Sequence, residues 1–180
     1  MFKQKLLTLA CVLMLTVALL VPSSAAAHTA AEVANPGFEA DNDVTTTPQG
    51  WTVTGTPGTS YTEWGGHSGD WRLSNWSAEP YVVETSQTLT GLHRGWYTLR
   101  AWVKSGGGQN EAYIALKNCG SHEARTDLPI APPDRWVQIV VSARVTRSHC
   151  TISLYSDANA GNWANFDDIE FVPGRAELSI

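Results

Sequence analysis

The chain has 180 residues with 12 basic and 17 acidic side chains, which gives a formal net charge of −5. This acidic balance disfavours a nucleic-acid partner, because neutralising phosphates requires an excess of Lys and Arg. The length leaves room for one ordinary domain and excludes a (β/α)₈ barrel, which takes roughly 250 residues.

The first 27 residues have the composition of a secretory signal peptide. Residues 1–5 include two lysines, residues 6–21 are apolar apart from two threonines, and residues 25–27 are three alanines suited to cleavage. The apolar run is shorter than a bilayer span, and no second run follows it. We therefore predict a secreted, extracellular protein without a membrane anchor after cleavage, in which residues 28–34 lead into the domain.

Apolar and polar residues alternate with period two along most of the remaining chain, and Gly, Pro, Asn and Asp separate the runs. No helical period longer than one turn is present, so the pattern predicts an all-β fold, an antiparallel β-sandwich of the jelly-roll type. The expected strands are residues 51–54, 81–89, 97–103, 112–117, 137–145, 150–156 and 166–172.

Two of these runs, residues 81–89 and 97–103, are separated by a short segment that starts and ends with glycine, and they have the signature of a β-hairpin. Residues 41–60 are rich in Thr, Pro and Gly and are expected to form a loop with one short strand. The domain is expected to span residues 35–172, with residues 173–180 as a C-terminal tail or the start of a linker.

All 8 Trp residues follow residue 50. In a β-sandwich most Trp side chains fill the core, although the indole N–H then needs a partner. Trp76 and Trp163 lie among Ser, Asn and Gly and are expected in loops. The Trp residues expected in the core are Trp51, Trp71, Trp96 and Trp136.

Cys119 and Cys150 are the cysteines that remain once the signal peptide is removed. An oxidising compartment permits a disulfide between them. The sequence gives no distance between the two thiols, so a disulfide and two free cysteines both stay open.

Two acidic residues near the ends of the domain suggest a cation. Alternation places Asp167 on the same face as Ile169 and Phe171, so its carboxylate should point inward and needs a partner. Glu39 follows a turn near the other end, and the first and last strands of a jelly roll are commonly neighbours. Glu39 and Asp167 could therefore share a Ca²⁺, which takes several hard oxygen ligands. The alternative is that both acids are solvated or pair with Arg.

The sequence offers little evidence for catalysis. Its five His are scattered, and it lacks the common zinc and nucleophile motifs. A glycosidase needs two carboxylates across an open cleft, whereas adjacent Asp167 and Asp168 should point to opposite faces of one strand. Arg100, Tyr113 and Lys117 occupy strand faces outside the core, so a small secreted polysaccharide lyase or hydrolase remains an alternative to a non-enzymatic protein.

A stronger signal comes from aromatic residues within amide-rich segments, at residues 74–77, 106–110 and 156–163. A sugar ring has an apolar face and a rim of hydroxyls, so one aromatic plane with a few short polar side chains can hold it. The composition therefore predicts a carbohydrate-binding site. A cell-surface adhesion domain that recognises protein is a further alternative.

Residues 35–39 (NPGFE) and 166–171 (FDDIEF) resemble the frame of carbohydrate-binding modules with a galactose-binding-domain-like jelly roll. Within that group the chain resembles carbohydrate-binding module family 61, which recognises β-1,4-galactan and is found attached to endo-β-1,4-galactanases. The similarity spans residues 35–172. It is carried by HSGDWRLSNWS, YVVETSQTLTGL, YTLRAWVKSGGGQN and YSDANAGNW.

This resemblance implies a structural Ca²⁺ held by Glu39 and Asp167, and a monomeric, non-catalytic module. The module would bind β-1,4-galactan or arabinogalactan side chains and target an associated galactanase to them. The chain stops about where a galactanase catalytic domain would begin, so a free-standing module and a piece of a larger enzyme both stay open. The implied sugar contacts are Trp76, Gln109, Asn110, Lys117 and Trp163, with Asp157, Asn159 and Asn162 shaping the same edge.

Overall fold

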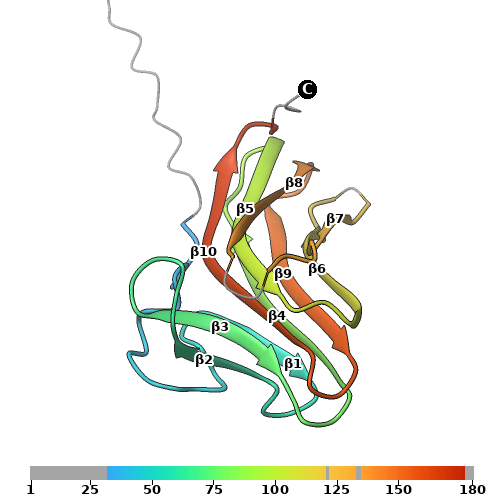
Figure 1. Ribbon diagram of the computed structural model, residues 1–180. Helices are drawn as coiled ribbons and strands as arrows, with labels where there is room; N and C mark the ends of the chain where they lie inside the picture. The colour runs from blue at the N-terminus through green and yellow to red at the C-terminus, as the bar shows by residue number, and fades with distance from the viewer. Residues whose placement is uncertain (1–31, 121, 133–134, 177–180) are drawn as a thin grey trace, which may run out of the picture.

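The computed structural model describes residues 32–120, 122–132 and 135–176 and confirms the predicted fold class. Two five-stranded antiparallel sheets pack face to face (Figure 1). Within the described residues no helix is long and apolar enough to cross a bilayer. The predicted signal peptide lies outside the described residues.

The first sheet has the strand order β1-β4-β9-β6-β7, and we call it sheet A; the second has the order β2-β3-β10-β5-β8, and we call it sheet B. The strands of sheet A are β1 (Thr52–Gly55), β4 (Tyr81–Thr90), β9 (His149–Ala158), β6 (Gln109–Lys117) and β7 (Ala124–Asp127). The strands of sheet B are β2 (Ser60–Trp64), β3 (Trp71–Trp76), β10 (Trp163–Pro173), β5 (Gly95–Ser105) and β8 (Val137–Val145).

The core lies between the sheets and is built from every second residue of the longer strands, because successive side chains of a strand point to opposite faces. Leu99 and Phe166 of sheet B and Ile114 and Leu154 of sheet A are fully buried there. Burial of such a side chain contributes about 1.5–3 kcal/mol relative to leaving it exposed. The alternate positions of sheet B consequently form an outer face.

The predicted hairpin of residues 81–89 and 97–103 is wrong. β4 pairs with β1 and β9 in sheet A, whereas β5 pairs with β10 and β8 in sheet B. The connection after Gly91 therefore crosses from one sheet to the other (Figure 1). Alternation leads to the same inward residues in both arrangements, so it does not distinguish a hairpin from two strands that face each other across the core.

The structure adds β2, β3 and β7 to the expected strands. The inward positions of β2 and β3 are largely polar, which hides the apolar alternation. Ser60 Oγ is 2.7 Å from Thr85 Oγ1, and Asn75 Nδ2 donates a 3.0 Å hydrogen bond to Ser156 Oγ. These contacts join the two sheets and pair four of the buried polar atoms, whereas Asn75 Oδ1 and Ser153 Oγ are buried without a hydrogen-bond partner.

The prediction that Asp167 points into the core is wrong, because β10 contains a β-bulge at this position. The pairing of β10 with β5 shifts between Asp167 and Glu170, and Asp168 has a positive φ of 47°. An extra residue in one strand reverses the alternation beyond it. Phe166 and Ile169 both reach the core, while Asp167 lies on the outer face of sheet B.

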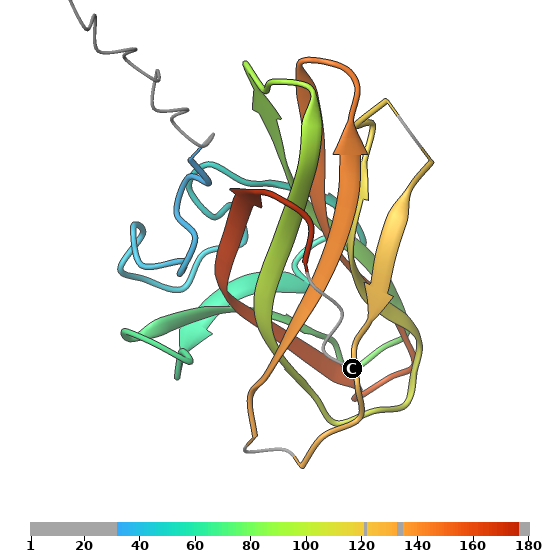
Figure 2. The same ribbon diagram turned by 90° about the horizontal axis from the view of Figure 1, so that it is seen from above.

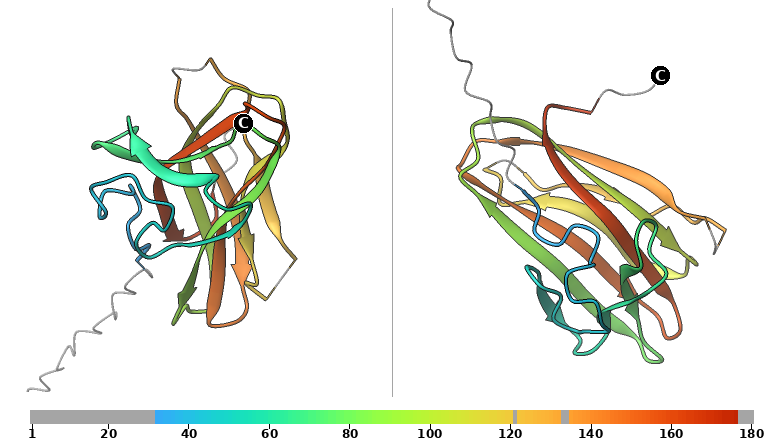
Figure 3. Two further views of the ribbon diagram at one scale, coloured as in Figure 1. Left: turned by 90° about the horizontal axis from the view of Figure 1, so that it is seen from below. Right: turned by 90° about the vertical axis from the view of Figure 1, so that its left-hand side faces the viewer.

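The segment before β1 packs beside the last strand (Figures 2 and 3). The backbone N–H of Ile169 donates to the carbonyl of Pro36 at 2.9 Å. Phe38 and Trp51 pack with ring centroids 5.4 Å apart, and Trp51 Nε1 donates to the carbonyl of Asn35. The NPGFE segment therefore lies next to the bulge that holds Asp167.

The structure also settles the open points on Cys and Trp. Cys119 and Cys150 form a disulfide. Trp51 and Trp71 are buried as expected, but Trp96 is 40% exposed under the Arg175 guanidinium and Trp136 is half-buried. Trp96 was misassigned because an aromatic residue at the start of a strand can belong to either face.

Candidate carbohydrate-binding groove

A groove of about 350 Å³ lies on the outer face of sheet B. Strands β2, β3, β10 and β5 each contribute side chains to it. This size and mixed lining suit a small ligand or part of a chain-like ligand. The lining residues are Tyr61, Glu63, Arg72, Ser74, Trp76, Lys104, Trp163 and Asn165.

Alternation along the strands places these side chains on one surface. In β3, Leu73 and Asn75 point into the sandwich, so Ser74 and Trp76 point out. In β10, buried Ala164 leaves Trp163 on the outer face. The residues that alternate with the core residues of these strands therefore line the groove.

Trp76 and Trp163 lie directly opposite each other in the β3–β10 pair. They are the last residue of β3 and the first of β10, so the expectation that both lie in loops is wrong. Trp76 is 43% exposed and Trp163 is half-buried. Such directly opposed residues have their Cβ atoms about 4.5–5.5 Å apart, which places two indoles at one end of the groove.

The indole of Trp163 rests against the turn between β5 and β6. A Cβ built on Gly106 would lie 2.9 Å from Trp163 Nε1 and 3.1 Å from its Cε2. Only glycine leaves room for the ring at this approach. Gly106, the first of the three consecutive glycines that precede Gln109, thus has a structural role next to the groove.

The polar lining is ordered by specific contacts. Arg72 donates to Glu63 Oε1 from Nη2 at 2.7 Å and to the carbonyl of Gly65 at 2.9 Å. Burial raises the pKa of the Tyr61 hydroxyl, and the nearby Glu63 carboxylate raises it further. Tyr61 therefore stays neutral and able to donate a hydrogen bond at neutral pH.

Lys104 of β5 lines the side of the groove opposite β2, the strand that carries Tyr61. Its Nζ lies over the Trp136 ring, 4.7 Å from the ring centroid. Tyr61, Glu63, Arg72, Ser74, Lys104 and Asn165 were not predicted from the sequence. For Lys104 and Asn165 the available signal is the polar–apolar alternation of β5 and β10, which predicts their outward direction, whereas only the strand pairing places them opposite each other.

Five of the predicted contacts gather near the adjacent ends of β6, β9 and β10, where they bond to one another and to the backbone of Gly108 and Trp163. Asn110 donates to Asp157 at 2.8 Å, and Asn159 donates to Asn110 at 3.3 Å. Asn162 donates to the carbonyl of Gly108, and Gln109 donates to the carbonyl of Trp163. Gln109 and Asn162 therefore brace the strand end that carries Trp163.

Lys117 is placed elsewhere. It lies on the outer face of sheet A, where it pairs with Glu84 at 3.2 Å and lies over the stacked rings of Tyr113 and Tyr155. The structure therefore does not bring Lys117 to Trp76 and Trp163. Arg100 is also separated from Tyr113 and Lys117, because it belongs to sheet B.

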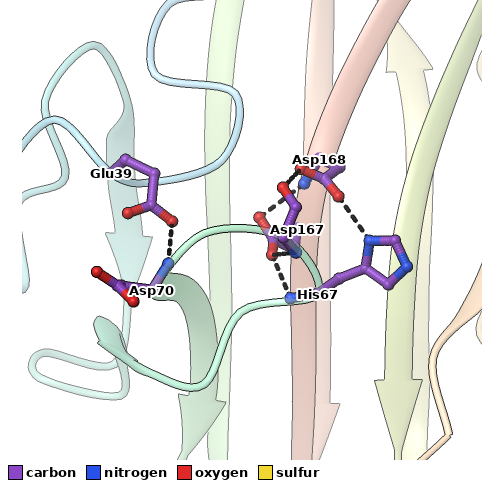
Figure 4. Close-up of polar contacts among 6 residues, drawn as sticks. Glu39, His67, Asp70, Asp167 and Asp168 are labelled. Atoms are coloured by element: carbon purple, nitrogen blue, oxygen red, sulfur yellow. Dashed lines mark hydrogen bonds and ion pairs between the residues drawn. The ribbon is translucent and has the colours of Figure 1, made fainter.

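The two predicted calcium ligands approach one loop, residues 65–70, from β10 and from the N-terminal segment. In Figure 4, Glu39 lies by Asp70 at one end of this loop and Asp167 by His67 at the other. Glu39 Oε1 accepts hydrogen bonds from the N–H groups of Asp70 at 2.9 Å and Trp71 at 2.8 Å. Both acids thus hold the loop against the sandwich.

Asp167 is fully buried under this loop although it lies on the outer face of the sheet. Its carboxylate accepts hydrogen bonds from the N–H groups of His67 at 2.6 Å, Ser68 at 3.3 Å and Asp168 at 2.7 Å. Burial nevertheless raises the pKa of the Asp167 carboxyl to about 7. The hydrogen bonds therefore compensate only part of the cost of burying its charge.

The surroundings of Asp167 fit a hard cation. A Cβ on Gly66 would collide with the carbonyl oxygens of Ser68 and Trp71 and would lie 2.9 Å from Asp167 Oδ2. Carbonyl and carboxylate oxygens are the ligands that Ca²⁺ takes. No cluster of three or more His, Cys, Asp or Glu side chains suited to a metal occurs within the described residues, so backbone oxygens would have to complete such a site.

Comparisons with solved structures identify similar folds. The TmCBM61 module, solved in complex with β-1,4-galactotriose, has 20% sequence identity and a TM-score of 0.68 over 78% of this chain and 97% of that one. The enzymatically active domain of bacteriophage CBA120 tailspike protein 4 has 12% identity and a TM-score of 0.60, over 79% of this chain and 21% of that one. The K3 cleaved adhesin domain of Lys-gingipain from Porphyromonas gingivalis W83 has 15% identity and a TM-score of 0.54, over 77% and 97%.

No protein-family model and no curated relative matches the chain. At these identities the structural matches establish the jelly-roll fold. The resemblance in fold to carbohydrate-binding module family 61 is confirmed.

Proposed function

We propose that the protein is a non-catalytic carbohydrate-binding module and that the groove on sheet B is its glycan site. The observation that carries this proposal is the pair of Trp76 and Trp163, two accessible indoles facing across adjacent strands beside a polar lining. Indole planes offer a platform to the apolar face of a sugar. Tyr61 supplies a hydroxyl that can bond to the sugar hydroxyls, and Ser74 and Asn165, which are buried and bond to each other, complete the polar lining.

We further propose β-1,4-galactan, free or as arabinogalactan side chains, as the polysaccharide. The support is the similarity of fold to a module whose structure holds β-1,4-galactotriose, together with the sequence segments that resemble that family. The chain would act as a monomer and bring an associated galactanase to its substrate. Secretion, based on the composition of residues 1–27, agrees with an extracellular polysaccharide as the ligand.

A binding role is favoured over hydrolysis by the charges in the groove. Among the described residues that line it, Glu63 is the one carboxylate, and it is paired with Arg72. Acid–base hydrolysis of a glycosidic bond needs two carboxyl groups flanking the bond. Asp167 and Asp168 lie beyond this lining, held by the loop of residues 65–70.

We also propose that Asp167 and Glu39, with the carbonyl oxygens of Ser68 and Trp71, form a structural Ca²⁺ site. When bound, Ca²⁺ supplies positive charge to a carboxylate that burial otherwise destabilises. The residues themselves fix the loop through their hydrogen bonds to His67, Ser68, Asp70 and Trp71. The ion would therefore affect folding stability more than glycan contact.

The test is a comparison of binding and turnover on the purified protein. We expect retarded migration in a gel containing β-1,4-galactan, with no new reducing or unsaturated ends in the polymer. Xylan and cellulose derivatives, which share the β-1,4 linkage but consist of other sugars, serve as matched control polymers. Release of product that survives further purification would overturn the non-catalytic role, and equal migration with and without galactan would overturn the proposed ligand.

A further inference from the structure

A second aromatic cluster lies on the outer face of sheet B, beyond the groove. It consists of Trp102, Trp136 and His67. Lys104 lies opposite Asn165 in the β5–β10 pair, and Trp102 lies opposite Asp167. Moving along β5 and β10 from the groove thus leads directly to Trp102.

The spacing suits an oligosaccharide. Trp163 and Asp167 are four positions apart along β10, which corresponds to about 13 Å of strand. One sugar ring does not span this distance, but a short chain of sugars does. A glycan that stacks on Trp76 or Trp163 and follows the face of the sheet would therefore arrive at Lys104, Trp136 and Trp102.

His67 covers one face of the Trp102 ring. The two rings are stacked with centroids 3.9 Å apart and an interplanar angle of 12°. The imidazole also meets the Trp136 ring edge-on, at 5.8 Å and 76°. A ring face that already carries an imidazole is closed to a sugar.

His67 is held in this position at two points. Its Nδ1 lies 2.6 Å from Asp168 Oδ2, and its backbone N–H donates to Asp167 Oδ2 at 2.6 Å (Figure 4). Its side chain is 28% exposed. The imidazole therefore forms a fixed wall whose outer surface meets solvent.

We propose that Trp102 and Trp136 form a latent aromatic subsite that continues the groove, and that His67 is the specificity-determining residue that closes it. This inference rests on the proposed glycan-binding function. His67 would limit the groove to short stretches of a chain, because the glycan meets the imidazole after Lys104. Removing the imidazole while keeping the backbone would extend the site.

The experiment compares His67→Ala with His67→Phe. Both variants lose the contact of the imidazole with Asp168 and keep the backbone N–H bonded to Asp167. Phe keeps a ring over Trp102, whereas Ala exposes it. Dissociation constants are measured by calorimetry for β-1,4-galactotriose and β-1,4-galactohexaose at one fixed calcium concentration.

We expect His67→Ala to bind galactohexaose about tenfold more tightly than the unsubstituted protein does, because one additional ring stacks. Galactotriose affinity should stay within about twofold, and His67→Phe should match the unsubstituted protein for both ligands. Adding Trp102→Ala to His67→Ala should abolish the gain. Trp102→Ala alone should leave both affinities unchanged, since that ring is already covered.

Two results would overturn the inference while leaving the proposed function intact. One is an equal ratio of hexaose to triose affinity in all variants, and the other is loss of hexaose binding on Trp102→Ala alone. The second result does not depend on the folding of any His67 variant. Failure of the unsubstituted protein to bind either oligosaccharide would instead contradict the proposed galactan function, and this inference with it.

Discussion

Trp76 and Trp163 are cross-strand neighbours, paired in register at the ends of β3 and β10 that border the groove. They are 87 positions apart in the sequence by their numbering, yet the antiparallel pairing brings them to the same end of sheet B. Their side chains can therefore contribute to one ligand site.

Trp76→Ala should weaken galactan binding by about 1–3 kcal/mol, by analogy with the stacking of bases on aromatic side chains. The unfolding free energy should change little, because the Trp76 side chain is 43% exposed. Calorimetric titration and thermal unfolding measure the two quantities. Trp96→Ala is the matched control, since Trp96 is equally exposed on sheet B but lies at the far end of β5. Equal losses of affinity in the two variants would contradict a site at Trp76.

Gly106→Ala tests the position of the second indole. The added Cβ would lie 2.9 Å from Trp163 Nε1, so the ring must shift. Overpacking of this kind typically costs about 1–3 kcal/mol. We expect weaker galactan binding. The loss of binding free energy should exceed the loss of unfolding free energy. Gly95→Ala is the matched control, because a Cβ built on Gly95 meets no atom within 4 Å. Gly91→Ala is unsuitable, because Gly91 has a positive φ.

Chelation should lower the melting temperature. A ligand that binds only the folded state stabilises it by about 2.7 kcal/mol at a hundredfold excess over its dissociation constant. Asp167→Asn should reduce stability and remove the response to added Ca²⁺, while Asp127→Asn, on the exposed end of β7, should respond as the unsubstituted protein does. Absence of bound metal by elemental analysis, with an unchanged melting temperature under chelator, would exclude the calcium site.

Reduction of the Cys119–Cys150 disulfide should lower the unfolding free energy by about 3–4 kcal/mol, because the bond closes a loop with a sequence separation of 31 residues. Both cysteines belong to the region of sheet A, so galactan affinity should be unaffected. Urea unfolding with and without reductant measures the effect. The double variant Cys119→Ala/Cys150→Ala should be insensitive to reductant, and a sensitive double variant would assign the effect to another group.

The bulge at Asp168 illustrates a limit of sequence periodicity. Alternation from Ile169 and Phe171 leads to an inward Asp167, but the extra residue reverses the faces. The need to compensate a buried carboxylate was nevertheless predicted correctly, because Asp167 is fully buried by the loop that covers it. Periodicity identifies a pattern of faces and does not reveal where an irregular residue interrupts it.

The sequence likewise predicted only part of the candidate site. The sequence singled out Trp76 and Trp163 because aromatic rings among small polar residues are unusual in a core. It also grouped Lys117 with them, although Lys117 lies on sheet A. Arg72 and Lys104 were missed, because a charged residue on a strand looks like any solvated surface position until its neighbours are known.

By itself the sequence determined the class of fold and the position of most long strands, because burying one face of a strand imposes a period of two that can be read locally. Only the tertiary structure decided which sheet each strand joins, since β4 and β5 present inward faces that satisfy a hairpin and a sandwich equally well. It also decided which outward side chains share a surface. That grouping depends on pairings between residues far apart in the chain, such as Trp76 with Trp163 and Trp102 with Asp167, and local periodicity carries no information about them.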